Sequence, residues 1–156
     1  MGLWDKIKSV KNMVTGGAAD VTLSVEGESI EGFVVHSRAF IKDADLKVDK
    51  VYLKVRSVEH VVAPDVDLAQ DQNGNVVRVR EDVRHSETTY QQEFVVSGGE
   101  TLKGDTEYTW TTEVSLGEDV WPTYKGRNAT HVWEVFVGLD AFGNDPDSGW
   151  IQVDLY

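Results

Sequence analysis

The stretch LKVDKVYLKVRSVEHVV, residues 46–62, decides the fold class. Apolar and polar residues alternate along it with a period of two, which is typical of a β-strand with one buried face. Lys54 and Arg56 are then expected to face water. The alternation changes parity before Val51, so we predict a β-bulge near Asp49 and Lys50. The apolar members predict core positions at Leu46, Val48, Val51, Leu53 and Val55.

The chain on either side of this stretch repeats the strand pattern in shorter runs, separated by turn-forming residues. An Asn73-Gly74 pair marks a hairpin turn. In the run after it, Val77, Val79 and Val83 alternate with Arg78, Arg80 and Arg84. We count eight or nine strands at spacings typical of an antiparallel sandwich. The runs are residues 20–25, 30–37, 76–83, 88–96, 108–114, 129–141 and 150–156.

The composition sets limits on the class of protein. A chain of 156 residues with 40% hydrophobic residues is long enough for one domain with a sizeable core. The net charge of -12 repels phosphate backbones and anionic membranes, which argues against nucleic-acid binding. There is no cysteine and no apolar run of membrane-spanning length. We therefore expect a soluble cytoplasmic protein whose stability comes from its core.

The N-terminal segment MGLWDKIKSVKNMVTGG, residues 1–17, has a different pattern. Its apolar residues recur at helical spacing, which predicts a short amphipathic helix ended by the glycine pair. Three lysines against one aspartate give residues 1–14 a local charge of +2. The helix could dock on the protein's own sandwich, bind a partner or second subunit, or lie on an anionic membrane. Membrane binding is the weakest of these because the rest of the chain is strongly acidic. The apolar face consists of Leu3, Ile7, Val10 and Val14, with Trp4 and Met13 on its two flanks.

Several turn and strand motifs stand in an order that resembles arrestin-like domains. They are EGESIEGFVV at 26–35, VVSGGETLKGDTEYTWTTEV at 95–114 and WPTYKGRNATHVWEVFVGLDAFGNDPDSGWIQV at 121–153. The last resembles the closing strands of the bacterial sporulation-control (SpoOM-type) family. The resemblance covers about residues 18–155 as a single N-terminal-type domain, although Glu26 stands where the family usually has proline. It implies an arrestin-like, immunoglobulin-like β-sandwich over residues 18–156, which regulates other proteins by binding them.

Catalytic motifs are absent from the sequence, so we expect no enzyme and no cofactor. The four histidines are scattered without the spacing of a zinc site, and no G-x-S-x-G nucleophile motif occurs. The alternative is a carbohydrate- or calcium-binding sandwich, because the loops at Asp71 and Asp145 are rich in oxygen ligands and the chain has five tryptophans. Turn formation already explains the Asx residues of both loops. The histidines are His36, His60, His85 and His131.

Strand parity leaves three apolar side chains on the faces opposite the core. In residues 150–156, Ile151, Val153 and Leu155 are expected to point inward, which leaves Trp150 outside. Val132 and Phe136 lie opposite the inward face of their own strand. If the two strands are neighbours, these three residues form an exposed apolar patch, unless a loop or the N-terminal helix covers it. We predict that a protein partner, or a second copy of the chain, binds this patch and the helix residues Leu3, Trp4, Ile7 and Val10.

Overall fold

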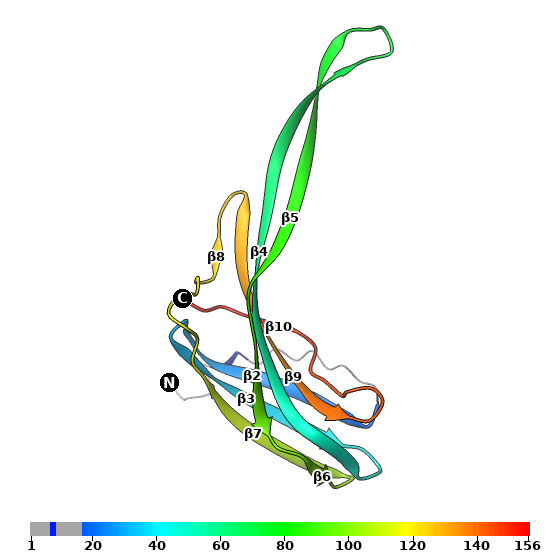
Figure 1. Ribbon diagram of the computed structural model, residues 1–156, viewed down its shortest axis with the longest axis vertical. Coiled ribbons are helices and arrows are strands. Elements are labelled where there is room, and N and C mark those ends of the chain that lie inside the picture. The colour runs from blue at the N-terminus through cyan, green and yellow to red at the C-terminus, as the bar shows by residue number, and fades with distance from the viewer. Residues whose placement is uncertain (1–6, 9–16) are drawn as a thin grey trace.

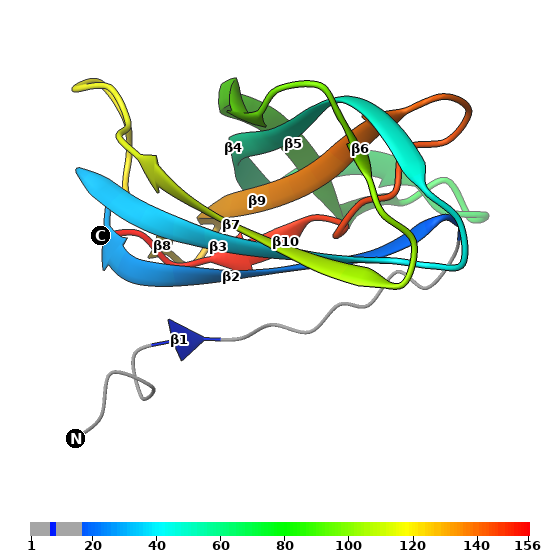
Figure 2. The same ribbon diagram turned by 90° about the horizontal axis from the view of Figure 1, so that it is seen from below.

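The computed structural model describes residues 7–8 and 17–156 and folds them into two antiparallel sheets that face each other (Figures 1 and 2). The first sheet has the order β1-β2-β3-β7. The second has the order β10-β9-β4-β5, with β6 pairing on β4 and β8 on β9. Strand bounds are β1 Ile7–Lys8, β2 Ala19–Ser29, β3 Gly32–Ile41, β4 Leu46–Gln70, β5 Val76–Ser97, β6 Glu100–Leu102, β7 Thr106–Val114, β8 Tyr124–Lys125, β9 Ala129–Ala141 and β10 Ile151–Val153.

The core fills the space between the two sheets. Alternate residues of each strand point into it, as the period-two pattern of the sequence predicts. In β4, Val48, Val51, Leu53 and Val55 are buried as predicted, and Leu46 packs partly against them. Trp133 of β9 is fully buried, and its indole nitrogen donates a hydrogen bond to the carbonyl of Trp121 at 2.9 Å. The all-β sandwich is thus confirmed.

The bulge predicted in β4 is present. In the pairing of β4 with β9, Val48 lies opposite Ala141 and Lys50 lies opposite Asp140, so Asp49 is the extra residue. The bulge shifts the side-chain alternation by one residue. Val48 and Val51 can therefore both face the core.

The N-terminal segment is described only at Ile7 and Lys8. The backbones of these two residues pair antiparallel with β2, opposite Glu26 and Val25. At these two positions the chain is extended and not helical, because pairing with the open edge of β2 satisfies backbone groups that a helix would satisfy internally. The remainder of the predicted helix lies outside the described residues. In the part of the chain that is described, no helix is long and apolar enough to span a membrane.

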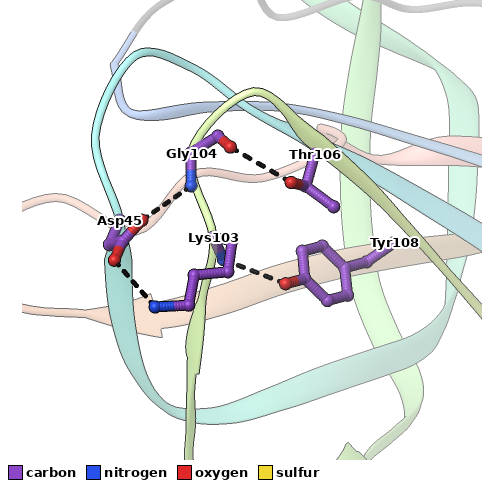
Figure 3. A network of polar contacts seen from close by, with 5 residues as sticks. All are labelled: Asp45, Lys103, Gly104, Thr106 and Tyr108. Atoms are coloured by element: carbon purple, nitrogen blue, oxygen red, sulfur yellow. Dashed lines mark hydrogen bonds and ion pairs between the residues drawn. The ribbon is translucent and has the colours of Figure 1, made fainter.

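A polar network fixes the turn between β6 and β7 against the turn before β4 (Figure 3). The Asp45 carboxylate accepts hydrogen bonds from the Gly104 backbone N–H at 2.9 Å and from the Lys103 ammonium at 3.2 Å. The backbone N–H of Lys103 donates to the Tyr108 hydroxyl, and Thr106 donates to the Gly104 carbonyl. The hydrogen bonds from the Gly104 backbone and the Lys103 side chain lower the pKa of Asp45, because both stabilise the carboxylate form.

A long hairpin of β4 and β5 projects well beyond the sandwich (Figure 1). The two predicted strands at 76–83 and 88–96 are one continuous strand, β5. The hairpin turn predicted at Asn73-Gly74 is present, and Gly74 has a positive φ of 80°. The Asp71 carboxylate accepts hydrogen bonds from the backbone N–H groups of Asn73 and Asn75, which is an Asx-type turn.

Candidate functional site

The outer face of the second sheet carries three aromatic side chains, which we call the aromatic cluster: Tyr52, Phe136 and Trp150, with Phe136 in contact with the other two. Tyr52 comes from β4, Phe136 from β9, and Trp150 directly precedes β10. The rings of Phe136 and Trp150 are 5.2 Å apart between centroids, and those of Tyr52 and Phe136 are 6.2 Å apart. Each residue lies on the outward parity of its strand, so the cluster follows from the pairing of neighbouring strands.

Cations from β4 lie over these rings. The guanidinium carbon of Arg56 is 3.8 Å from the centroid of the Trp150 ring, and Arg56 Nε donates a hydrogen bond to Glu134 at 2.7 Å. The Lys54 ammonium is 5.3 Å from the Tyr52 centroid and 5.9 Å from the Phe136 centroid. A cation over a ring face is attracted by the quadrupole of the ring. The predicted apolar patch is therefore a mixed aromatic and cationic surface.

Tyr52 is held more firmly than the other two rings. Only 7% of the residue is exposed, and its hydroxyl donates a hydrogen bond to the Asp145 carboxylate at 2.9 Å. Its ring lies over Gly138 of β9, where an added Cβ would meet the ring carbon Cζ and the hydroxyl at 2.4 Å. Burial first, and then the neighbouring Asp145, raise the pKa of Tyr52 above its ordinary value, because both disfavour the phenolate.

The loop between β9 and β10 folds back beside the cluster. The backbone N–H of Leu139 donates to the carbonyl of Pro146, and that of Ser148 donates to the carbonyl of Val137, both at 2.9 Å. These bonds bring Asp145 within reach of Tyr52. The loop thus secures one end of the cluster, while Phe136 and Trp150 remain partly exposed.

The structure brings together two of the three predicted patch residues. Phe136 and Trp150 are in contact, and the third, Val132, lies on the same face of β9 and is partly buried. Most of the N-terminal residues predicted to bind a partner lie outside the described part of the chain. Leu3, Trp4 and Val10 lie outside the described residues, and Ile7 is described only through its backbone pairing with β2.

Sequence reasoning assigned Lys54 and Arg56 to solvent and missed their role in the cluster. Both face outward as expected, but the register of β4 against β9 decides what they meet. Lys54 lies opposite Phe136, and Arg56 lies opposite Glu134. Their alternation with Leu53 and Val55 is the sequence signal that places them on the outer face. No local pattern in the sequence predicts the register of β4 against β9.

The two loops considered for calcium use their carboxylates within the protein. Asp71 accepts three hydrogen bonds, from the backbone of Asn73 and from the backbone and side chain of Asn75. Asp145 accepts from Tyr52 and from the backbone of Ala141, and Asp147 accepts from the backbone of Gly149. Among residues 7–8 and 17–156, no group of three or more His, Asp or Glu side chains could hold a metal ion.

His131 of β9 is buried and has a structural role. Its Nδ1 lies 2.9 Å from the carbonyl of Pro122, so Nδ1 is the donor of this pair. In the neutral imidazole, Nε2 then accepts a hydrogen bond from the Thr89 hydroxyl at 2.7 Å. Thr89 lies at a register shift in the pairing of β4 with β5, where Ser57 faces Tyr90 and the next residue of β4 faces Thr88. The histidine thus ties this bulge to the segment before β8.

Comparisons with known proteins support the fold. No protein-family profile matches the sequence, and no curated protein matches it. Among solved structures, the crystal structure of Spo0M, the sporulation control protein of Bacillus subtilis, is similar with a TM-score of 0.60 and 17% sequence identity. The match covers 90% of this chain but only half of the Spo0M chain. The arrestin-like resemblance expected from the sequence motifs is therefore confirmed at the level of the fold.

Proposed function

We propose that this chain is a non-catalytic regulatory or adaptor module that binds another protein through the aromatic cluster. The observation that carries the proposal is the stack of Arg56 on Trp150 at 3.8 Å beside Phe136. Trp, Tyr and Arg are the residue types that dominate the binding energy of protein interfaces. Here one side chain of each type lies on the same outer sheet face.

The arrangement also suits the chemistry of a protein partner. The side chain of Arg56 is 32% exposed, and its hydrogen bond to Glu134 holds the guanidinium in place before any partner arrives. A surface that is ordered in advance loses less side-chain entropy on binding. Lys54 adds positive charge beside partly exposed rings, so an acidic or aromatic segment of a partner would be favoured.

Carbohydrate binding and calcium binding are less well supported by the structure. A sugar platform needs an open aromatic face, whereas one face of Trp150 is already covered by Arg56. The carboxylates of the loops at Asp71 and Asp145 accept hydrogen bonds from their own loops and from Tyr52. A regulatory role agrees with the fold shared with Spo0M, a sporulation control protein.

In-cell photo-cross-linking with a benzophenone amino acid tests this proposal. The probe is placed at Gln152, which is exposed on the outer face of the second sheet beside Glu134. The matched control position is Thr109, which is exposed on β7 of the other sheet. The proposal predicts a discrete cross-linked protein from position 152, which is lost when Arg56→Ala and Trp150→Ala are combined. Equal labelling from both positions, or labelling that survives the two substitutions, would refute the proposal.

A further inference from the structure

Beyond Val62, whose backbone N–H donates to the carbonyl of Asn128, the projecting hairpin has no packing partner within the described part of the chain. We define the arm as residues 62–70 of β4 and 76–84 of β5, with the turn between them. The last pair between β4 and β9 is Val61 with Ala129, so beyond that point the sheet has two strands only (Figure 1). Every residue from Ala63 to Thr89 is exposed. An isolated two-stranded hairpin is at best marginally stable in water, so the arm is expected to gain from a partner.

The arm also concentrates exposed apolar side chains. Eleven large hydrophobic residues are exposed in the described part of the chain, and six of them lie in the arm. Leu68 is 72% exposed and Val76 is 65% exposed. Such residues are usually scattered singly over a monomer, and their concentration marks an interaction surface. The other four are Val66, Val77, Val79 and Val83.

The strand register separates the charges of the arm onto its two faces. On one face Arg80 lies opposite Val66 and Arg78 lies opposite Leu68. We call this the arginine face: Val62, Pro64, Val66, Leu68, Gln70, Val76, Arg78, Arg80, Asp82 and Arg84. The other is the carboxylate face: Ala63, Asp65, Asp67, Ala69, Val77, Val79, Glu81 and Val83. One face is thus net positive, and the other has three carboxylates and no Lys or Arg.

The charges of both faces lack partners within the arm. Asp65 lies directly opposite Glu81, and like charges at such cross-strand positions are destabilising. Arg78 and Arg80 face aliphatic side chains across the ribbon. Among the described ion pairs, none involves an Arg, Asp or Glu of the arm. A second surface of opposite charge would pair with the arginines of one face or with the carboxylates of the other.

We propose that copies of this chain associate through their arms, with the arginine face of one arm packed on the carboxylate face of another. Both faces carry aliphatic side chains between their charges, so contact buries apolar surface and pairs arginine with carboxylate at once. This contact goes beyond the proposed function, because it uses neither the aromatic cluster nor a foreign protein.

The spacing of the charges indicates that a second copy of the chain packs on the arm. Arg78 and Arg80 are two residues apart, as are Asp65 and Asp67, so both rows repeat at about 6.8 Å along their strands. Packing two arginine faces together, or two carboxylate faces, would bring like charges into contact. The contact is therefore heterologous, and each added copy leaves one face of each kind free. Such assemblies either close into rings or grow further.

Sedimentation equilibrium of the full chain, combined with charge-reversal variants, tests the arm contact. The wild-type chain is studied from about 1 to about 200 μM, a range that detects micromolar association. R78E/R80E makes both faces acidic, and D65K/D67K makes both faces basic. The control variant K125E/R127E makes the same charge change as R78E/R80E on exposed residues of β8 and the turn after it, outside the arm. Circular dichroism of each variant verifies the strand content.

The expected results distinguish the arm contact from other modes of association. The average mass of the wild type and of K125E/R127E should rise from 17.4 kDa to at least about twice that value with concentration, and fall again at high salt. R78E/R80E alone and D65K/D67K alone should remain at 17.4 kDa. An equimolar mixture of these two variants should associate, as should the single chain that carries all four substitutions.

Three outcomes would overturn the arm contact. The first is a wild-type chain that stays monomeric at every concentration, in which case the arm meets a different molecule or none. The second is association of R78E/R80E or D65K/D67K as strong as that of the wild type, which would place the interface elsewhere. The third is a failure of the two variants to associate when mixed, which would exclude charge pairing between the faces.

Discussion

Replacing Gly138 by alanine is expected to displace Tyr52 from the aromatic cluster. The added Cβ would lie 2.4 Å from the Tyr52 Cζ and hydroxyl oxygen, closer than Cβ contacts in folded proteins allow. The backbone of β9 is held by pairing on β4, so the tyrosine ring is the part that must move. That movement breaks the 2.9 Å hydrogen bond from the Tyr52 hydroxyl to Asp145.

The expected loss of stability combines two effects. Forcing an extra methyl group into a filled site costs about 1 to 3 kcal/mol. Losing a hydrogen bond to a charged acceptor costs about 1.5 to 3 kcal/mol more. Alanine in a strand is itself preferred to glycine by roughly 0.5 to 1 kcal/mol, which offsets part of the loss. We therefore expect Gly138→Ala to lower the free energy of unfolding by about 2 to 4 kcal/mol.

Urea unfolding of a double-mutant cycle separates this contact from any general effect. The four chains are the wild type, Gly138→Ala, Tyr52→Ala and the double variant. In the Tyr52→Ala background the added methyl group meets no ring, so Gly138→Ala should be neutral or slightly stabilising there. The coupling free energy should then be about 2 kcal/mol or more, within the range for residues in contact. An equal loss with and without the tyrosine ring would refute the reasoning.

Three further substitutions test other parts of the molecule. Asp45→Asn should lower the thermal midpoint at pH 7 but not in strong acid. The lowered pKa of Asp45 stabilises the folded chain above the ordinary aspartate pKa of about 3.9, and this contribution is lost as the pH falls through the pKa of Asp45 in the folded chain. Midpoints measured from pH 7 to pH 2 check this, and a loss independent of pH would contradict it. Trp133→Ala should cost about 3 to 5 kcal/mol in urea unfolding, because the side chain is fully buried; a loss below about 1 kcal/mol would contradict its place in the core. Asp71→Ala should speed amide hydrogen exchange in the arm and leave exchange in β9 unchanged, since its carboxylate holds only the turn; unchanged exchange in the arm would show that the turn does not depend on it.

Local patterns in the sequence predict the parts of the fold that depend on parity. The change of alternation around Asp49 marks the bulge, and the buried residues of β4 follow from it. Parity likewise places Phe136 and Trp150 on the outer face, and neighbouring strands bring them into contact. These features follow from the period of two in a strand, which is visible in any single stretch.

Features that depend on strand length and register are not visible locally. Alternation of Val79 with Arg78 and Arg80 looks the same in a half-buried strand and in a two-stranded arm. The difference arises because β9 begins at Ala129, so its pairing with β4 ends at Val61. The position of Arg56 over Trp150 depends on pairing across three strands, which a single stretch of sequence does not encode.

The affinity of the chain for the protein cross-linked from Gln152 tests the central claim most directly. It is measured by calorimetry for the wild type, for Trp150→Ala and for Phe40→Ala, which truncates an exposed aromatic residue on β3 of the other sheet. If the aromatic cluster is the binding surface, Trp150→Ala should weaken binding by about 30-fold or more, as expected for a residue that dominates an interface. Phe40→Ala should leave the affinity within about twofold of the wild type, since it lies outside that surface. Equal losses for the two variants, or unchanged binding by Trp150→Ala, would contradict the account.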